Sequence, residues 1–206
     1  MPRATQAIIG ANVVVFLLQY SMGDWATIWL ALWPLGSSAA LFGGPDTGFE
    51  PWQLVTYSFL HGGVSHIFFN MFAIYSFGSA LEQFFGTRYY VTLYFVSVVT
   101  AGVAQLAVSA LMASPYPTLG ASGGVFGLLL AYGMYFPRNR IVMLFLPIPL
   151  QAWVVVLGYG VLELFLGVTG TQAGVAHFAH LGGMLGAFVM IQWRRGKPPF
   201  SPRRRR

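Results

Sequence analysis

The sequence predicts an all-α membrane protein with six transmembrane helices and a long first loop at the membrane surface. Of its 206 residues, 56% are hydrophobic and only 8% are charged, whereas a soluble domain has about 25% charged residues. The hydrophobic residues also form long runs, and about 20 apolar residues cross a membrane as a helix. The 17% aromatic content excludes a disordered chain. Because the chain has no cysteine, disulfides and a thiol nucleophile are excluded.

Six apolar segments are close to the length of a membrane span. The first lacks the small-residue cleavage site that closes a secretory signal. The fifth contains Pro147 and Pro149 near its start. We expect one transmembrane domain, followed by a basic tail at residues 194–206. Its spans are predicted at residues 6–22, 63–86, 89–112, 121–136, 142–167 and 175–193.

The segment between the first two spans, residues 23–62, has a different composition. It contains four tryptophans and three prolines, together with a Gly-Gly-Pro-Asp turn at residues 43–46. It is too interrupted to span a membrane and too aromatic for a free loop. Indole rings favour the headgroup level of a bilayer. We therefore expect a structured loop that lies in the interface.

The cations predict the orientation. With six spans, all 11 Lys and Arg residues fall on one side, which the positive-inside rule makes cytoplasmic. Both termini are then cytoplasmic, and the short termini indicate a prokaryotic inner membrane. We expect the basic tail to set orientation and to contact anionic lipids rather than nucleic acid.

Polar side chains recur near the outer ends of the second, fourth and sixth spans. His66 and Asn70 are four residues apart at the start of the second span and share a helical face. Ser122 opens the fourth span, and His180 lies near the start of the sixth. All three spans run inward, which places these side chains within about 10 Å of the outer boundary. A hydroxyl, an imidazole and hydrogen-bond donors at one depth are the components of a serine hydrolase.

Several glycines lie near Ser122 and His180 in the fourth and sixth spans, and this pattern has two interpretations. Small residues let membrane helices approach closely, so a short serine side chain could reach an imidazole. The same pattern fits a serine that only helps helices to pack and a histidine that is only structural. The residues alone do not decide between a hydrolase and this structural interpretation. The glycines concerned are Gly120, Gly123, Gly124 and Gly127 in the fourth span, and Gly182, Gly183 and Gly186 in the sixth.

At these positions the chain resembles the rhomboid family of intramembrane serine proteases. The family's GxSG motif is matched at residues 120–123, its AHxxG motif at residues 179–183, and its histidine followed by asparagine four residues later at His66 and Asn70. All three motifs occur in order, each on its expected span. The likeness is specific over residues 51–193 and extends loosely to the whole six-span bundle.

The resemblance implies a role for each of these residues. Ser122 is expected to be the nucleophile and His180 its general base, in a dyad without an acidic third member. The absence of Asp and Glu from the outer end of the sixth span is consistent with such a dyad. His66, Asn70 and the backbone N–H of Ser122 are expected to hold the oxyanion. Phe126, where the family often has tyrosine, is expected to pack on the imidazole. No cofactor and no metal are implied.

The resemblance also implies what the protein acts on. We expect an endopeptidase that cleaves transmembrane segments of membrane proteins near their outer ends, with an active site that opens to the outer side. The fifth span resembles the family's lateral substrate gate. Backbone hydrogen bonding adds a physical reason for that cleavage site. A helical substrate must open its backbone hydrogen bonds before it is cut, which favours helix-weakening residues in the outer part of the substrate.

Three other residues bear on this prediction. Gln53 follows Trp52 where the family commonly has arginine. Glu82 matches a family glutamate that forms hydrogen bonds within the protein, and we interpret it as structural. Glu163, alone in the fifth span, either lines a path for water or bonds a neighbouring helix, and we favour the second.

Three rival functions are weaker. A zinc protease would use His61, His66, His177 and His180, but no glutamate accompanies them in a zinc-binding pattern. A transporter would need a pair of broken helices, which the sequence does not indicate. The more serious alternative is a catalytically silent relative that binds membrane clients. Such proteins typically lose the serine or the histidine, and this chain retains both.

Overall fold

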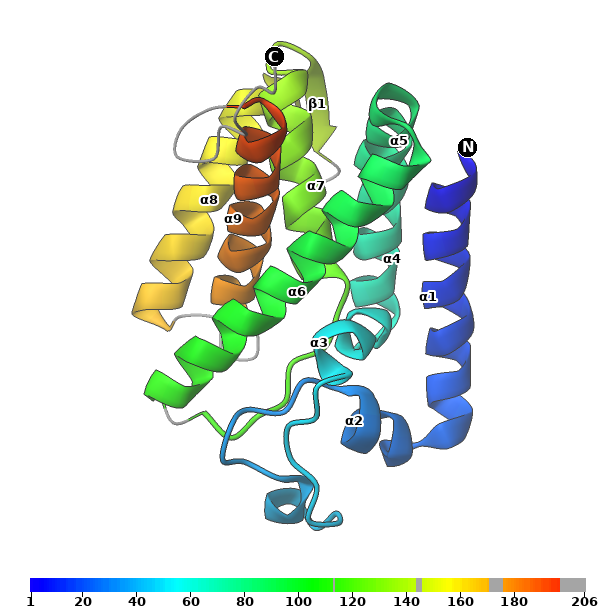
Figure 1. Ribbon diagram of the computed structural model, residues 1–206, viewed down its shortest axis with the longest axis vertical. Coiled ribbons are helices and arrows are strands. Elements are labelled where there is room, and N and C mark those ends of the chain that lie inside the picture. The colour runs from blue at the N-terminus through cyan, green and yellow to red at the C-terminus, as the bar shows by residue number, and fades with distance from the viewer. Residues whose placement is uncertain (113, 144–145, 171–175, 197–206) are drawn as a thin grey trace, which may run out of the picture.

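The computed structural model describes residues 1–112, 114–143, 146–170 and 176–196, and its described part is a bundle of membrane-length helices (Figure 1). Among these residues, four helices are long and apolar enough to cross a membrane, and a shorter apolar helix accompanies them. The helices of the bundle are α1 (Arg3–Met22), α4 (Val64–Ala73), α5 (Ser79–Phe85), α6 (Thr87–Met112), α7 (Ser122–Tyr135), α8 (Ala152–Thr169) and α9 (His177–Arg194).

Helices α4 and α5 form one continuous span, because a π-helical turn, η3 (Ile74–Gly78), joins them. The turn places Gly78 against α6, where an added Cβ would lie 2.6 Å from the hydroxyl oxygen of Tyr90. At the end of the span, the carboxylate of Glu82 accepts hydrogen bonds from the backbone N–H groups of Ala4 and Thr5 and from the hydroxyls of Thr5 and Thr87. Glu82 therefore ties α1 to α5 and α6, the structural role predicted from the sequence.

Helix α7 is the short central helix, in contact with α6, α8 and α9. Its 14 residues rise about 21 Å, less than the roughly 30 Å of a hydrocarbon core. In Figure 1 the described residues 114–121 climb from below into the bundle before α7 begins. Backbone hydrogen bonds pair Leu32 with Thr118, and the N–H of Gly120 donates to the carbonyl of Tyr57. Ser122 therefore starts its helix inside the bundle rather than at its edge.

Glycines set the spacing of α6, α7 and α9. A Cβ added at Gly183 of α9 would collide with the carbonyl oxygen of Gly123 in α7. Cβ atoms at Gly186 and Gly127 would collide with Thr100 and Ser97 of α6, respectively. The three helices therefore touch backbone to backbone or backbone to side chain, as small residues allow in membranes.

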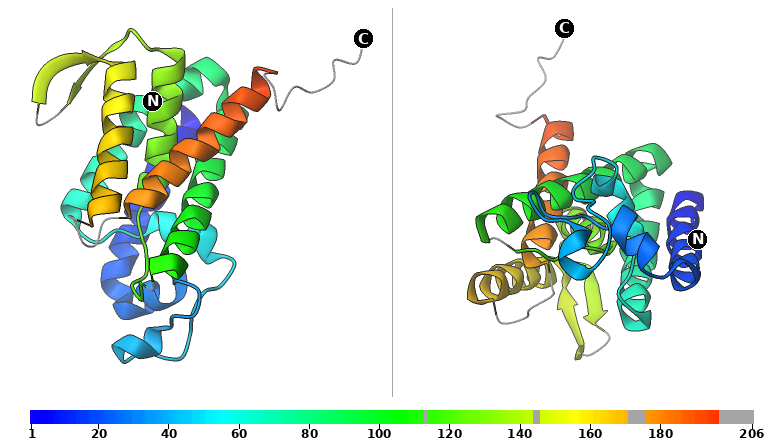
Figure 2. Two further views of the ribbon diagram at one scale, coloured as in Figure 1. Left: turned by 90° about the vertical axis from the view of Figure 1, so that its left-hand side faces the viewer. Right: turned by 90° about the horizontal axis from the view of Figure 1, so that it is seen from below.

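The region before α8 differs from the sequence prediction. A helix was expected from residue 142, whereas residues 140–143 and 146–151 pair as two antiparallel strands, β1 (Arg140–Met143) and β2 (Leu146–Gln151), together called the hairpin, and α8 begins at Ala152. Pro147 and Pro149 explain the difference, because each lacks the N–H that a helix interior needs. The hairpin projects from the side of the bundle (Figure 2).

The first loop carries four short helices: α2 (Asp24–Leu30), η1 (Ala39–Phe42), α3 (Gln53–Thr56) and η2 (Tyr57–Phe59). Seen from below, it lies across the base of the bundle (Figure 2). The buried side chain of Gln53 holds it together: Oε1 accepts from the N–H groups of Trp33 and Glu50, and Nε2 donates to the carbonyl of Gly48. An amide therefore anchors the loop where the family commonly has arginine. Tyr57 anchors it to α6 by donating its hydroxyl to the carbonyl of Val98, 2.8 Å away.

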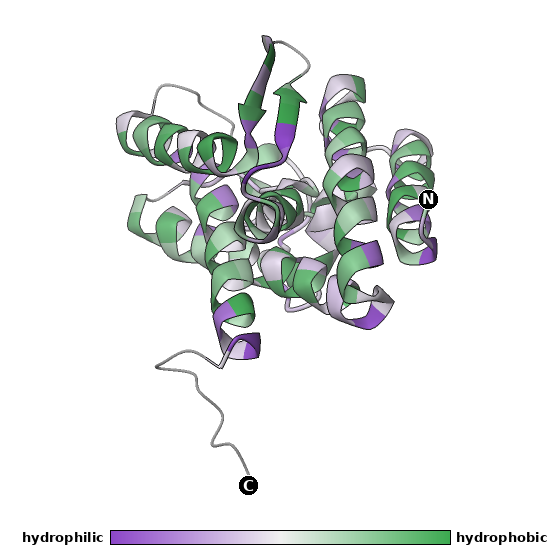
Figure 3. Ribbon diagram, turned by 90° about the horizontal axis from the view of Figure 1, so that it is seen from above, coloured by the Kyte–Doolittle hydropathy of each residue, from purple (hydrophilic) through white to green (hydrophobic). Residues whose placement is uncertain are grey.

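The two ends of the bundle differ in charge. The N-terminus, the turn between α5 and α6, the start of β1 and the end of α9 share one end, opposite the first loop (Figure 1). Viewed onto that end, hydrophilic stretches gather at the helix termini (Figure 3). The Arg194 guanidinium lies 4.1 Å from the ring centre of Tyr89, and that of Arg195 lies 4.4 Å from the ring centre of Tyr135. The rest of the basic tail, residues 197–206, lies outside the described residues.

Candidate active site

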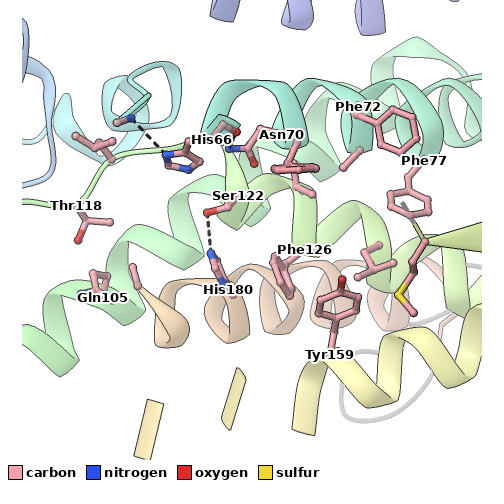
Figure 4. A pocket seen from close by; sticks show the side chains of 18 of the residues that line it. His66, Asn70, Phe72, Phe77, Gln105, Thr118, Ser122, Phe126, Tyr159 and His180 are labelled. Atoms are coloured by element: carbon pink, nitrogen blue, oxygen red, sulfur yellow. Dashed lines mark hydrogen bonds between the residues drawn. The ribbon is translucent and has the colours of Figure 1, made fainter. Parts of the chain in front are cut away.

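The first residue of α7 meets the first turn of α9. Oγ of Ser122 lies 2.8 Å from Nε2 of His180, within hydrogen-bond distance (Figure 4). His180 is buried, with 8% of its surface exposed. The close approach of α7 and α9 at Gly123 and Gly183 makes this short contact possible. A nucleophile and a base at this distance have the geometry that hydroxyl activation requires.

An aromatic ring fixes the plane of the imidazole. Phe126, one turn after Ser122, stacks on His180 with ring centres 4.2 Å apart and an angle of 4° between the planes. Tyr159 of α8 meets the same phenyl ring edge-on at 5.9 Å. The stack limits rotation of the imidazole, so that Nε2 stays directed at Ser122.

His66 has the tautomer that an oxyanion donor needs. Its Nδ1 accepts a hydrogen bond from the backbone N–H of Gly62 at 3.3 Å, which leaves the proton on Nε2. That Nε2 faces the turn before Ser122, because a Cβ at Gly120 would lie 2.8 Å from it. The ring of His61 lies 5.1 Å away, and its own pKa is lowered to about 4 mainly by burial. His61 is therefore neutral beside His66 at physiological pH.

Two further donors face the same space. The Asn70 amide nitrogen donates to the backbone carbonyl of His66 at 3.1 Å, and an amide has a second N–H to offer. The first N–H groups of a helix also have no partner within that helix, and Ser122 is the first residue of α7. These groups present several donors near Ser122, the arrangement that stabilises an oxyanion.

These residues line a cavity of about 1020 Å³ between α4, α7, α8 and α9. Figure 4 shows Ser122 and His180 on one side, His66 and Asn70 opposite them, and the rings of Phe72, Phe77 and Tyr159 further along. The wall also includes Ile141, Val142 and Met143 of the hairpin, which the sequence assigned in part to a helix. The cavity therefore joins the polar site to apolar walls of the kind a hydrophobic segment fits.

The prediction from the sequence did not include a carboxylate at this site. It predicted no acidic group near His180, because the sixth span has none at its outer end. The structure brings Glu163 from α8 instead: its Oε2 lies 2.6 Å from Nδ1 of His177 and 2.9 Å from Nδ1 of His180. Glu163 thus bonds a neighbouring helix, the favoured of its two predicted roles. Its spacing from both histidines in the sequence gave no signal of this contact.

The structure therefore gathers all five predicted site residues, Ser122, His180, His66, Asn70 and Phe126, around one cavity. The fold and this site define a multi-pass helical membrane protein with a serine–histidine pair facing a cavity. A family model described as the rhomboid domain matches residues 48–195. The chain belongs to the rhomboid family.

Relatives with curated names agree with this family. The chain is 28% identical over 188 residues to the rhomboid protease GluP of Bacillus subtilis, a match that covers 91% of this chain and 34% of that protein. It is 31% identical over 129 residues to the rhomboid protease GlpG of Klebsiella pneumoniae, covering 62% of this chain and 41% of that protein. A putative rhomboid protease of Bacillus subtilis, YdcA, is 28% identical over 186 residues, 86% of each chain. The chain thus spans less than half of GluP and of GlpG.

Proposed function

We propose that this chain is an intramembrane serine endopeptidase that cleaves transmembrane segments of membrane proteins near their outer ends. One observation carries the proposal: Ser122 Oγ and His180 Nε2 lie 2.8 Å apart on the wall of a cavity inside a membrane bundle. Family membership and the names of the relatives support the same activity.

The reaction begins with proton transfer. His180 accepts the Ser122 proton at Nε2 while Oγ attacks the scissile carbonyl, and the carbonyl oxygen becomes negative. The Nε2–H of His66, an amide N–H of Asn70 and the backbone N–H of Ser122 then stabilise that charge. His180 returns the proton to the leaving amine, and a water molecule hydrolyses the acyl-enzyme by the same steps. This scheme uses no cofactor and no metal.

The depth of Ser122 determines where a substrate is cut. Helix α7 is short, and Ser122 lies at its outer end, deeper in the membrane than the first loop. A helical substrate must open backbone hydrogen bonds to present a carbonyl there, and each bond opened in hydrocarbon costs several kcal/mol. Substrates with glycine or proline in the outer third of their span are therefore favoured, and they reach the site laterally beside α8.

The proposal includes an orientation in the cell. The arginine-rich end of the bundle faces the cytoplasm, with both termini on that side, and the site opens to the outer face of the inner membrane. The positive-inside rule supports this orientation. The partners are then transmembrane substrates and membrane lipids, with no nucleic acid.

The alternative is a catalytically silent relative that binds membrane clients. The contact of Ser122 with His180 and the stack of Phe126 on that histidine weigh against it, because a protein that only binds has no use for a hydroxyl directed at an imidazole.

Cleavage of a single-span substrate in proteoliposomes tests the proposal. The original chain should cut it, and Ser122→Ala should abolish cleavage with an unchanged melting temperature, because one hydroxyl leaves little cavity. Cleavage by Ser122→Ala at an appreciable rate would exclude Ser122 as the nucleophile. Client binding without cleavage by the original chain would favour the silent relative. Mass spectrometry should place the cut in the outer third of the span, and cuts in the cytoplasmic half would contradict the proposed depth and orientation.

A further inference from the structure

Glu163 is a buried carboxylate on a helix that is otherwise mostly exposed. Only 6% of its surface is accessible, whereas Val161, Leu162, Leu164 and Phe165 around it are each more than 45% exposed. Acidic groups inside membranes are costly, are almost always paired, and by default mark functional positions. The partners of Glu163 therefore indicate why it is there.

One partner is enough to explain a structural role, but there are two. Oε2 contacts Nδ1 of His177 at 2.6 Å and Nδ1 of His180 at 2.9 Å. The first contact is a hydrogen bond. The second is an ion-pair contact that lies outside hydrogen-bond alignment. His177 therefore satisfies the carboxylate, which leaves the proximity of Glu163 to His180 in need of its own explanation.

The contacts on His180 specify where its proton lies. The two ring nitrogens face different partners: Nε2 faces Ser122 and Nδ1 faces Glu163. If Nε2 is to accept the serine proton, the resting ring must carry its own proton on Nδ1. That proton then faces Oε2, and the positive ring formed during catalysis would lie beside a negative oxygen. Proximity is sufficient for this attraction, since charges interact strongly in a low-dielectric interior.

The same three residues could also be considered as metal ligands, but their spacing does not suit a metal. Two ligands at tetrahedral zinc, with bonds of about 2.0–2.1 Å, are about 3.3 Å apart. The distances from Oε2 to the two Nδ1 atoms are 2.6 and 2.9 Å. At these distances the carboxylate interacts directly with both rings, by a hydrogen bond to His177 and by charge with His180.

We propose that Glu163 is a positioning residue for the base: held by His177, its carboxylate fixes the proton of His180 on Nδ1 and stabilises the imidazolium. The site then works as a serine–histidine–glutamate set whose acid comes from α8 rather than from the helix of the histidine. This inference rests on the proposed protease function. It differs from the dyad that the resemblance implied.

Glu163→Gln tests the charge while preserving the shape of the side chain. We expect kcat to fall about 10²-fold, less than the roughly 10⁴-fold loss when the acid of a soluble triad is replaced by its amide, because the contact here is not an aligned hydrogen bond. KM should stay within about threefold. The matched control is Glu82→Gln, which neutralises a second buried glutamate, at the opposite end of the bundle. In the folded fraction it should leave kcat unchanged.

Two measurements keep the inference testable if Glu163→Gln folds poorly. The first is the rate at which a fluorophosphonate probe labels Ser122 in the monodisperse fraction, which reports activation of the serine without substrate binding. The second is Glu163→Asp, which retains the charge but places it one methylene further from His180 and should lose less activity than Glu163→Gln.

The outcomes separate this inference from the proposed function. If Ser122→Ala is inactive while Glu163→Gln keeps its full kcat and labelling rate, the protease stands and the role of Glu163 is overturned. Glu163→Asp labelling Ser122 no faster than Glu163→Gln overturns it equally, because the retained charge would then make no difference. If the original chain does not cleave, or cleaves without Ser122, the proposed function itself is overturned.

Discussion

Helices α8 and α9 have the same length but are held very differently. Each has 18 residues, of which nine are buried in α9 and only four in α8. In α9, Gly182 and Gly183 meet neighbouring backbone, whereas a Cβ at Gly158 of α8 would meet no atom within 4 Å. α9 carries the proposed base, and α8 reaches the site with the side chains of Val155, Tyr159 and Glu163.

The difference shows how the bundle combines rigidity with access. Ser122 and His180 lie on helices whose spacing is set by backbone contact, so the helix separation that permits their 2.8 Å contact does not depend on flexible side chains. Helix α8 has fewer buried residues, and its side of the cavity is where we propose that a substrate helix approaches. Four substitutions test this contrast, from the largest expected effect to the smallest.

The first compares Gly183→Ala with Gly158→Ala. At Gly183 the new Cβ would collide with the carbonyl oxygen of Gly123, and because backbone cannot move aside cheaply, we expect a loss of about 3 kcal/mol or more and no cleavage. At Gly158 the Cβ meets open space, so stability and activity should be unchanged. Thermal unfolding in detergent measures both. Equal melting temperatures for the two variants would remove the contrast between α9 and α8.

The second substitution concerns the proposed oxyanion donors, which lie opposite Ser122 and His180. Asn70→Ala should lower kcat by about 10²–10³-fold, the effect of losing one oxyanion donor in a soluble protease, with KM nearly intact. The loss is smaller if His66 and the backbone N–H groups compensate. Steady-state kinetics on a fluorogenic single-span substrate provide both constants. Unchanged turnover would exclude Asn70 from the oxyanion site.

The third substitution tests whether the first loop is held as firmly as α7 and α9. Gln53→Ala leaves two backbone N–H groups and one carbonyl without their partner, and each buried unpaired group costs about 1–3 kcal/mol. We expect a clear drop in melting temperature and faster proteolysis of residues 33–52. Gln151→Ala is the control, because this glutamine is exposed at the start of α8. A loop that remains protease-resistant in Gln53→Ala would show that other contacts hold it.

The fourth substitution removes the ring of Phe126, which lies between α8 and α9. Phe126→Leu deletes the stack on His180 and the edge contact with Tyr159. A ring stack contributes about 0.5–1.5 kcal/mol, so kcat should fall two- to tenfold. Tyr159→Phe preserves the ring and should behave like the original chain. A Phe126→Leu enzyme with normal kcat would mean that Ser122 and Glu163 alone orient the imidazole.

Residues that lie in sequence motifs could be predicted, whereas contacts that depend on tertiary packing could not. Ser122, His180, His66 and Asn70 lie on motifs that fix their helices and depths, so their meeting could be expected. Glu163 could not be placed in this way, because its contact depends on how α8 rotates against α9, and no local pattern determines that rotation. Hydropathy also extended the fifth span over residues 142–151, although Pro147 and Pro149 indicated non-helical backbone. Gln53 was read as a departure from the family, and its three hydrogen bonds only appear once the loop is folded.

The backbone contact between Gly123 and Gly183 has an evolutionary consequence. Every substitution of either glycine adds atoms where a carbonyl or a neighbouring side chain already lies, so this part of the bundle has almost no mutational freedom. α8 is in the opposite position, because most of its side chains face outward and tolerate exchange. An acid supplied by α8 can therefore be gained, lost or moved along that helix by single mutations while the serine and histidine stay in place. On the proposed function, the tolerant helix is where new substrate preferences and new rates have room to arise.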